Sequence, residues 1–202
     1  MRAYSSAPPA ALLSFRAMAR AVLFDLDGVL VDTYEVWLHL LGDVARRLGY
    51  PPIPPDEYRK SWGQGIEVDV EQFFPRHGVE EIRRLYAGLY GDHLGHLRVM
   101  EGAREYLGAL ALPRAVITNS PMALARRALE AVRLWDCFQT VVGCDDVARS
   151  KPAPDMVFEA CRRLRVVPAD AVLVGDSCYD EEAARAAGAV FVQFRSFAEL
   201  RI

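Results

Sequence analysis

The sequence predicts an α/β fold with a Rossmann-like parallel sheet as its core and a small all-helical segment inserted after the first strand. Short apolar runs alternate with helical patterns over residues 98–202, which indicates a parallel sheet. Residues 34–97 show helical periodicity alone. The chain has 202 residues, of which 52% are hydrophobic, and this is enough to bury such a core.

The first predicted strand, Ala21–Phe24, is a short apolar run followed by two carboxylates, Asp25 and Asp27. Buried acids are costly unless a cation or a proton compensates for them. Ligands of an open parallel sheet bind at the carboxyl ends of strands, so this strand end is a candidate site. Gly28 allows a sharp turn and a close approach of the backbone to a ligand. A capped turn is the alternative interpretation, because Asp is common after strands.

Helical patterns fill the segment that follows. Proline and glycine breaks divide it into four predicted helices, Tyr34–Leu48, Asp56–Trp62, Ile66–Phe74 and Val79–Leu97. Asp56 is expected to cap the second of these helices. The expected domain organisation is therefore an α/β core, residues 19–33 and 98–202, with a helical segment, residues 34–97, between its two parts.

Strands and helices alternate in the second part of the core. The predicted helices are Ala103–Leu110, Pro121–Val132, Pro154–Leu164 and Tyr179–Ala187, the last ended by Gly188. The predicted strands are Ala115–Thr118, Thr140–Val142, Ala171–Val174 and Ala189–Val192. This order places helices on both faces of the sheet.

Composition and charge exclude several function classes. The formal net charge of −3 gives no reason to expect nucleic acid or an anionic membrane as a partner. No apolar run approaches the roughly 18 residues that a membrane span needs. Cys144, Cys161 and Cys178 lie in or beside apolar patterns and are expected to be buried thiols in a reducing cytoplasm. Residues 1–18 contain no acid and are expected to form a disordered N-terminal extension.

Polar residues follow three further predicted strands. Thr118 and Asn119 end the second strand, Lys151 lies in the loop after the third, and Asp176 and Asp180 follow the fourth. Each has an ordinary structural explanation as a helix cap, a surface lysine or a turn. Because the carboxyl ends of parallel strands share one edge, we expect these side chains to meet there.

Their chemistry suits a metal and a phosphate. Asp25, Asp27 and Asp176 can share one hard divalent cation, most naturally Mg²⁺. The Thr118 hydroxyl and the Lys151 ammonium can hold the oxygens of an anion such as phosphate. Of the 24 basic residues only two are lysines, so this retained ammonium is informative. A carboxylate beside a metal and a bound phosphate is a competent nucleophile.

Four segments together resemble, in order, the motifs of the haloacid dehalogenase superfamily of phosphotransferases. They are Asp25–Thr33, Val116–Ser120, Lys151–Asp155 and Gly175–Asp180. The helical segment after the first motif resembles the cap of the group that contains phosphoglycolate phosphatases and β-phosphoglucomutases. The resemblance spans about residues 19–194 and implies a Mg²⁺-dependent phosphatase that acts on a small phosphorylated metabolite, as a monomer or homodimer in the cytoplasm.

The resemblance also implies a role for each matched residue. Asp25 would attack phosphorus, and Asp27 would protonate the leaving oxygen and later deprotonate water. Thr118, the backbone amide of Asn119 and Lys151 would hold the phosphoryl group.

The same resemblance implies a metal site and a phosphate-binding turn. Asp25, the backbone carbonyl of Asp27, and Asp176 would bind Mg²⁺, with Asp180 as an outer ligand. Gly28 would lie with the phosphate-binding residues.

Substrate choice is expected to rest on Tyr58–Gly65 in the helical segment. Arg59 and Lys60 would meet a substrate carboxylate, and Gly63 and Gln64 would bring the backbone close to the ligand. A helix end with solvated basic residues is the alternative. The segment resembles the Gly-x-Gly cap segment of phosphoglycolate phosphatases, which makes 2-phosphoglycolate the lead substrate.

Several other functions stay open from the sequence. They are a sugar-phosphate phosphatase, a phosphoglucomutase-like enzyme, a pyrophosphatase and an inactive binding protein of the same superfamily. Trp37 stands where the mutases of this group commonly carry a histidine, which weakens the mutase hypothesis. Retention of both Asp25 and Asp27 argues against an inactive protein. A receiver-like phospho-switch would lack the long helical segment.

Overall fold

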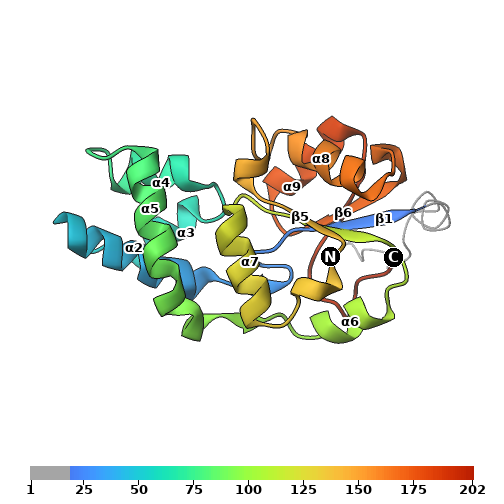
Figure 1. The fold of residues 1–202 in the computed structure, drawn as a ribbon, viewed down its shortest axis with the longest axis horizontal. Coiled ribbons are helices and arrows are strands. Elements are labelled where there is room, and N and C mark those ends of the chain that lie inside the picture. Colours follow the sequence, from blue (N-terminus) through green and yellow to red (C-terminus); the bar gives the residue numbers. More distant parts are fainter. Residues whose placement is uncertain (1–18) are drawn as a thin grey trace, which may run out of the picture.

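A five-stranded parallel sheet forms the centre of the computed structural model, which describes residues 19–202 (Figure 1). Its strand order is β5-β4-β1-β6-β7. The strands are β1 Ala21–Phe24, β4 Arg114–Ile117, β5 Thr140–Val142, β6 Ala171–Gly175 and β7 Val190–Gln193. The predicted parallel α/β fold is confirmed. The predicted extension of residues 1–18 lies outside the described residues.

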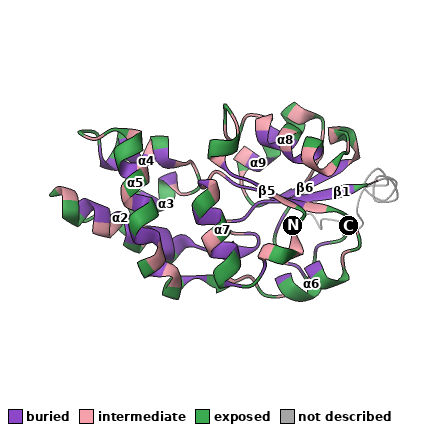
Figure 2. Cartoon of the chain, viewed as in Figure 1, coloured by how far each residue is buried: buried purple, intermediate pink, exposed green. Residues whose placement is uncertain are grey.

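The sheet is buried on both faces because its strands alternate between two apolar layers. In β1, Val22 and Phe24 face one layer and Leu23 faces the other. Helices α8 and α9 cover the Leu23 face, and α6 and α7 pack in the opposite layer (Figure 1). Figure 2 shows β1 and β6 as buried, whereas the helices carry exposed outer faces. The bounds are α6 Ala103–Ala109, α7 Met122–Ala131, α8 Asp155–Leu164 and α9 Cys178–Ala187.

The central strand places its end at the middle of the sheet edge. β1 pairs with β4 on one side and with β6 on the other, both parallel. The residue after β1, Asp25, therefore lies between the polar residues that follow β4 and β6. Gly188 ends α9 in the left-handed conformation at φ 76°, which agrees with the predicted helix end.

The segment after the first motif is helical, and it extends away from one end of the sheet (Figure 1). Its elements are α2 Tyr34–Leu48, α3 Pro55–Ser61, α4 Ile66–Phe73, α5 Val79–Leu89 and the 3₁₀ helix η1 Tyr90–His96. The expected cap at Asp56 is wrong, because Pro54 is the N-cap of α3 and Asp56 lies in its first turn. Pro55 fits the first position of this helix because the N–H of that residue would have no partner within the helix.

A two-stranded antiparallel ladder marks where the chain leaves the core and returns to it. β2 Val31–Asp32 pairs with β3 Arg98–Val99. Two-residue strands carry no readable alternation, and neither was predicted. The apolar cluster of the sheet face continues into the helices of residues 34–96, where the Trp37 ring packs edge-on against Tyr86 at 5.5 Å between centroids. The helical segment is therefore packed against the core.

The cysteines only partly follow the prediction. Cys161 is buried and Cys144 is half-buried, but Cys178 is exposed. Cys178 is the first residue of α9, where its side chain stands outside the apolar stripe of that helix. Over residues 19–202, none of the helices combines the length and the apolar character needed to cross a bilayer.

Candidate active site

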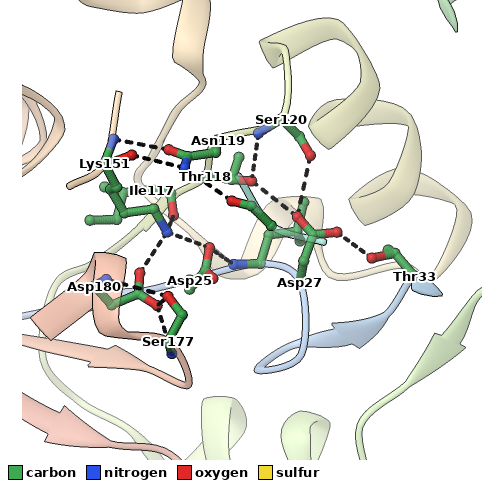
Figure 3. Close-up of polar contacts among 12 residues, drawn as sticks. Asp25, Asp27, Thr33, Ile117, Thr118, Asn119, Ser120, Lys151, Ser177 and Asp180 are labelled. Atoms are coloured by element: carbon green, nitrogen blue, oxygen red, sulfur yellow. Dashed lines mark hydrogen bonds and ion pairs between the residues drawn. The ribbon is translucent and has the colours of Figure 1, made fainter. Parts of the chain in front are cut away.

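A buried lysine joins two carboxylates at the carboxyl edge of the sheet (Figure 3). Lys151 Nζ lies 2.8 Å from Asp25 Oδ1 and 2.6 Å from Asp180 Oδ1, and it donates to the carbonyl of Ile117 at 3.3 Å. Burial disfavours this ammonium, but Asp180 and Asp25 outweigh burial and raise its pKa above the ordinary value. Lys151 is therefore charged at neutral pH.

Asp25 follows β1 directly and is only 7% exposed. Burial and the charge of Asp180 raise the pKa of Asp25 well above its ordinary value, although Lys151 opposes that change. The amide of Leu26 donates to Asp25 Oδ1 at 2.7 Å. A carboxylate in this position gains from any further positive charge that a ligand brings.

Three hydroxyls hold the carboxyl of Asp27. Thr33 donates to Asp27 Oδ1, and the hydroxyls of Thr118 and Ser120 each donate to Asp27 Oδ2 at 3.2 Å (Figure 3). Thr118 itself has no exposed surface and does not line the cavity described below. In this structure the Thr118 hydroxyl serves Asp27, and the expected contact between that hydroxyl and a phosphoryl group stays a prediction.

The turn after the first strand requires glycine for a reason that its sequence does not reveal. Gly28 has φ 80°, and a Cβ on it would lie 2.2 Å from Asp176 Oδ2. The close approach expected of Gly28 is thus made, within the protein, by Asp176. Gly175 has the same relation to Asp180, since a Cβ there would lie 2.3 Å from the Cβ of Asp180. Both acids therefore lie directly against a glycine, where a larger residue would displace them.

Three acids form a group that fits a hard cation. One oxygen each from Asp25, Asp176 and Asp180 lies within 4.8 Å of the others. Partial burial and the charge of Asp180 raise the pKa of Asp176 to about 6. Asp180 is wholly buried, and its Oδ2 accepts from the amide and the hydroxyl of Ser177. Clustered carboxylate oxygens match the donor set that Mg²⁺ prefers, since a divalent charge relieves their repulsion.

Asn119 fixes the lysine loop and touches the helical segment. Its Oδ1 accepts from the amide of Lys151 at 3.0 Å, and its Nδ2 donates to the carbonyl of Lys151 at 3.1 Å. The same Nδ2 donates to the carbonyl of Gly63 at 3.2 Å. One amide thus positions the buried ammonium and ties the Gly63 turn to the sheet edge.

A cavity of about 130 Å³ lies between the sheet edge and the helical segment. The core side contributes charged and hydroxyl side chains, Asp25, Asp27, Ser120, Lys151, Asp176 and Ser177. The helical side contributes an aromatic wall with one acid, Trp37, Tyr58, Trp62, Ile66, Asp69 and Tyr86. Gly63 and Gly65 complete that wall. The predicted core residues are therefore brought together, with the helical segment covering them.

Three predicted substrate residues do not reach this cavity. Arg59 and Lys60 are exposed, and neither lines the wall. The Arg59 guanidinium stacks over the Tyr34 ring at 4.2 Å. Gln64 also stays off the wall, because its Nε2 donates back to the carbonyl of Lys60 at 3.0 Å. Within the described residues, the one cationic side chain on the wall is that of the buried core lysine.

The sequence analysis assigned no role to five residues that the site uses. Thr33, Ser120 and Ser177 stand inside the quoted motifs. Asp69 and Tyr86 were not considered, although Asp69 falls in the apolar stripe of α4. An acid in such a stripe is a readable signal, because charged side chains are rarely buried without a purpose.

Comparisons with known proteins agree with this geometry. The sequence pattern of the family described as "Haloacid dehalogenase-like hydrolase" matches residues 22–194. A phosphoglycolate phosphatase of Chromobacterium violaceum is 35% identical over 181 residues, which cover 84% of this chain and 82% of that relative. An N-acetylmuramic acid 6-phosphate phosphatase of Pseudomonas aeruginosa is 30% identical over 181 residues, covering 86% and 80% of the two chains.

A solved structure shares the fold. The crystal structure of CbbY from Rhodobacter sphaeroides in complex with phosphate superimposes with a TM-score of 0.79 at 24% identity, and the match covers 90% of this chain and 96% of that one. The family pattern spans most of the described residues, and the two relatives above, at 35% and 30% identity, are named as phosphatases. The predicted resemblance is confirmed: the chain belongs to the haloacid dehalogenase-like hydrolases and is a phosphoric monoester hydrolase.

Proposed function

We propose that this chain is a Mg²⁺-dependent phosphatase that hydrolyses a small phosphate monoester through an aspartyl-phosphate on Asp25. The observation that carries the proposal is the pairing of a buried carboxylate, Asp25, with a buried ammonium, Lys151, in the wall of the cavity between the sheet edge and the helical segment. The ammonium offsets the repulsion between an attacking carboxylate and a phosphate.

Two half-reactions follow from this arrangement. In the first, an oxygen of Asp25 bonds to phosphorus while the ester P–O bond breaks, and the leaving oxygen takes a proton from Asp27. In the second, Asp27 takes a proton from water, the water oxygen attacks phosphorus, and the Asp25–phosphorus link breaks to release inorganic phosphate. Thr33, Thr118 and Ser120 hold the Asp27 carboxyl in one orientation for both steps.

The acidic group beside Asp25 is where a cation belongs in this proposal. Asp25, Asp176 and the backbone carbonyl of Asp27 would hold Mg²⁺, and Asp180 would support the site through its bond to Lys151. When bound, Mg²⁺ supplies positive charge to the phosphoryl oxygens and to the crowded carboxylates.

Two classes of leaving group are candidates. 2-Phosphoglycolate is the lead substrate from the sequence, and the relative in Chromobacterium violaceum carries the corresponding name. The carboxylate of that substrate would not meet Arg59 or Lys60 in the cavity as it stands. A phosphate ester with a hydroxylated leaving group is the second candidate, favoured by the aromatic wall and its single acid.

Release of inorganic phosphate tests the proposal. The purified protein should hydrolyse an aryl phosphate and at least one small alkyl phosphate with Mg²⁺, and excess chelator should stop both reactions. Acid quenching during turnover, followed by peptide mass spectrometry, should find one phosphate on Asp25. Full activity in chelator, or label on a different residue, would contradict the mechanism as drawn.

A further inference from the structure

The helical wall of the cavity contains one acid that the proposed mechanism does not use. Asp69 lies in α4 and is only 7% exposed. It shares the buried face of that helix with Ile66, Val70 and Phe73. A carboxylate at a core position is costly unless it has a partner, so its place on this wall calls for a functional explanation.

Protein groups satisfy only one oxygen of this acid. The Tyr86 hydroxyl donates to Asp69 Oδ2 at 3.0 Å. Across residues 19–202 no basic side chain forms an ion pair with Asp69, and its Oδ1 accepts no hydrogen bond from a described group. Because Asp69 lines the cavity, Oδ1 is left to accept from whatever occupies that space.

The surroundings hold this acid rigidly. Tyr86 is buried at 1% exposure and packs edge-on against the Trp37 ring. Tyr58, 3% exposed, also lines the wall, and its ring stacks on Tyr34 at 5.7 Å between centroids. A carboxylate fixed by such a frame loses little entropy when it binds a ligand, so its preference is specific.

The electrostatics of Asp69 agree with an acid that has one hydroxyl partner and no cationic partner among residues 19–202. Burial raises the pKa of Asp69 to about 7, although the hydrogen bond from Tyr86 opposes the change, and Glu67 adds to it. An incoming hydroxyl or ammonium donor would supply the missing interaction. A second anion on the leaving group would instead meet another negative charge in a low-dielectric wall.

We propose that Asp69, positioned by Tyr86, is a specificity-determining residue that selects leaving groups carrying a hydroxyl or ammonium donor and disfavours those carrying a carboxylate. The cavity of about 130 Å³ suits a short chain at this place. The inference rests on the proposed phosphatase function and narrows its substrate class.

Four esters with the same two-carbon chain test this inference. They are 2-hydroxyethyl phosphate, phosphoethanolamine, 2-phosphoglycolate and ethyl phosphate, which carry a hydroxyl, an ammonium, a carboxylate and no polar group. All are followed by release of inorganic phosphate with Mg²⁺. For the wild type we expect kcat/KM for the hydroxyl and ammonium esters to exceed that for 2-phosphoglycolate by about tenfold or more.

Asp69→Asn is the diagnostic variant, with Glu71→Gln as its control. Glu71 lies on the same helix, is exposed and is absent from the cavity wall, so its change removes the same charge elsewhere. Asp69→Asn should cut the ammonium-to-carboxylate ratio by about tenfold or more and leave ethyl phosphate within about threefold. Glu71→Gln should leave every ratio unchanged. If Asp69→Asn does not fold, Tyr86→Phe should reduce the same ratio in the same direction.

The outcomes separate this inference from the proposed function. If no ester and no aryl phosphate is hydrolysed with Mg²⁺, the phosphatase function fails. If hydrolysis occurs but the wild type prefers 2-phosphoglycolate, the role of Asp69 is overturned while the phosphatase function stands. The same conclusion follows if Asp69→Asn lowers all four esters equally, because a merely structural residue would act in that way.

Discussion

The two sides of the cavity use charge in opposite ways. At the sheet edge, Asp25 and Asp180 share the ammonium of Lys151 at 2.8 and 2.6 Å. On the helical wall, Asp69 accepts from a tyrosine hydroxyl and has no cationic partner among residues 19–202. Two acids of the sheet edge therefore have a protein cation as partner, whereas the acid of the wall leaves one acceptor open to a ligand.

This difference separates chemistry from selection. In the proposed mechanism the sheet edge meets only the phosphoryl group, which is the same in every substrate. The wall meets the leaving group, which differs between substrates. Changes at the sheet edge should therefore lower activity toward all esters, and changes on the wall should alter the order among them.

The nucleophile is the sharpest test of that separation. Asp25→Asn should abolish hydrolysis of every ester, by about four orders of magnitude or more, because an amide cannot attack phosphorus. Single-turnover phosphate release from an aryl phosphate measures the loss. Asp136→Asn, an exposed acid away from the cavity, is the matched control and should retain full activity. If the residual rate of Asp25→Asn differed between esters, the sheet edge would also take part in substrate selection, and the separation of the two sides would be wrong.

The second largest loss of activity is expected from Asp27, the proposed general acid and base. Asp27→Asn should slow hydrolysis of alkyl phosphates by about two to four orders of magnitude, since both half-reactions need its proton. An ester with a good leaving group should lose less in the first half-reaction. Asp32→Asn provides the control, because this acid of the same motif is exposed and accepts a bond from the amide of Tyr34. Equal losses for alkyl and aryl esters would remove Asp27 from the acid role.

The sheet edge was more readable from sequence than the wall. Ala21–Phe24 is apolar, four residues long and followed by acids, so both the strand and the site at its end could be predicted. The hydroxyl of Ser120 on Asp27 was not predictable, because it depends on how β4 and β1 end side by side. A parallel sheet brings the ends of its strands together, but the side-chain conformations at those ends cannot be predicted from the sequence.

The residues of the helical wall could not be predicted from the sequence, for a geometric reason. Helix α3 has seven residues, too few for its periodicity to reveal which side faces inward. Tyr58 turns toward the cavity, and Arg59 beside it lies over Tyr34. Asp69 was readable in principle, since it occupies a core position of the α4 stripe. The prediction favoured Arg59 and Lys60 because basic residues are usual partners of anions, and in this structure both lie off the cavity wall.

The two lysines of the chain should differ in the same way in their effect on stability, because Lys151 belongs to the sheet edge and Lys60 to the helical segment. Lys151→Met should lower the free energy of unfolding by about 3 to 5 kcal/mol, because it leaves two buried carboxylates without their cation. Lys60→Met is the matched control and should change it by no more than about 0.5 kcal/mol, since Lys60 is exposed. Urea unfolding at pH 7 measures both. Similar values for the two variants would mean that the buried ion pairs contribute little.

Asp69, the acid on the wall, should have a smaller effect on the free energy of unfolding, and this effect should depend on pH. The pKa of Asp69 is raised from 3.8 to about 7, so the unfolded chain loses this proton first as pH rises. Stability from this group is therefore greatest below about pH 4 and is lost as pH approaches 7. Asn has no proton to lose, so the Asp69→Asn variant does not lose stability in this way. The difference in unfolding free energy between the variant and the wild type should therefore be about 2 kcal/mol larger at pH 8 than at pH 5. Urea unfolding at both values, with Glu71→Gln as control, checks this. A gain independent of pH would show that the wall acid is not destabilised by its charge.

The smallest expected effect concerns the two basic residues that the sequence favoured. Arg59 and Lys60 stand outside the cavity, and Arg59 is engaged with the Tyr34 ring. Arg59→Ala and Lys60→Ala should therefore each change KM for 2-phosphoglycolate and for ethyl phosphate by less than about threefold, and by the same factor. Exposed cations contribute little across solvent, whereas a bidentate contact with a substrate carboxylate would be worth a factor of ten or more. Initial rates over a range of both esters measure the effect. A selective rise in KM for 2-phosphoglycolate in either variant would mean that α3 turns these side chains inward when substrate binds, and the wall would then have to be redrawn with a cation beside Asp69.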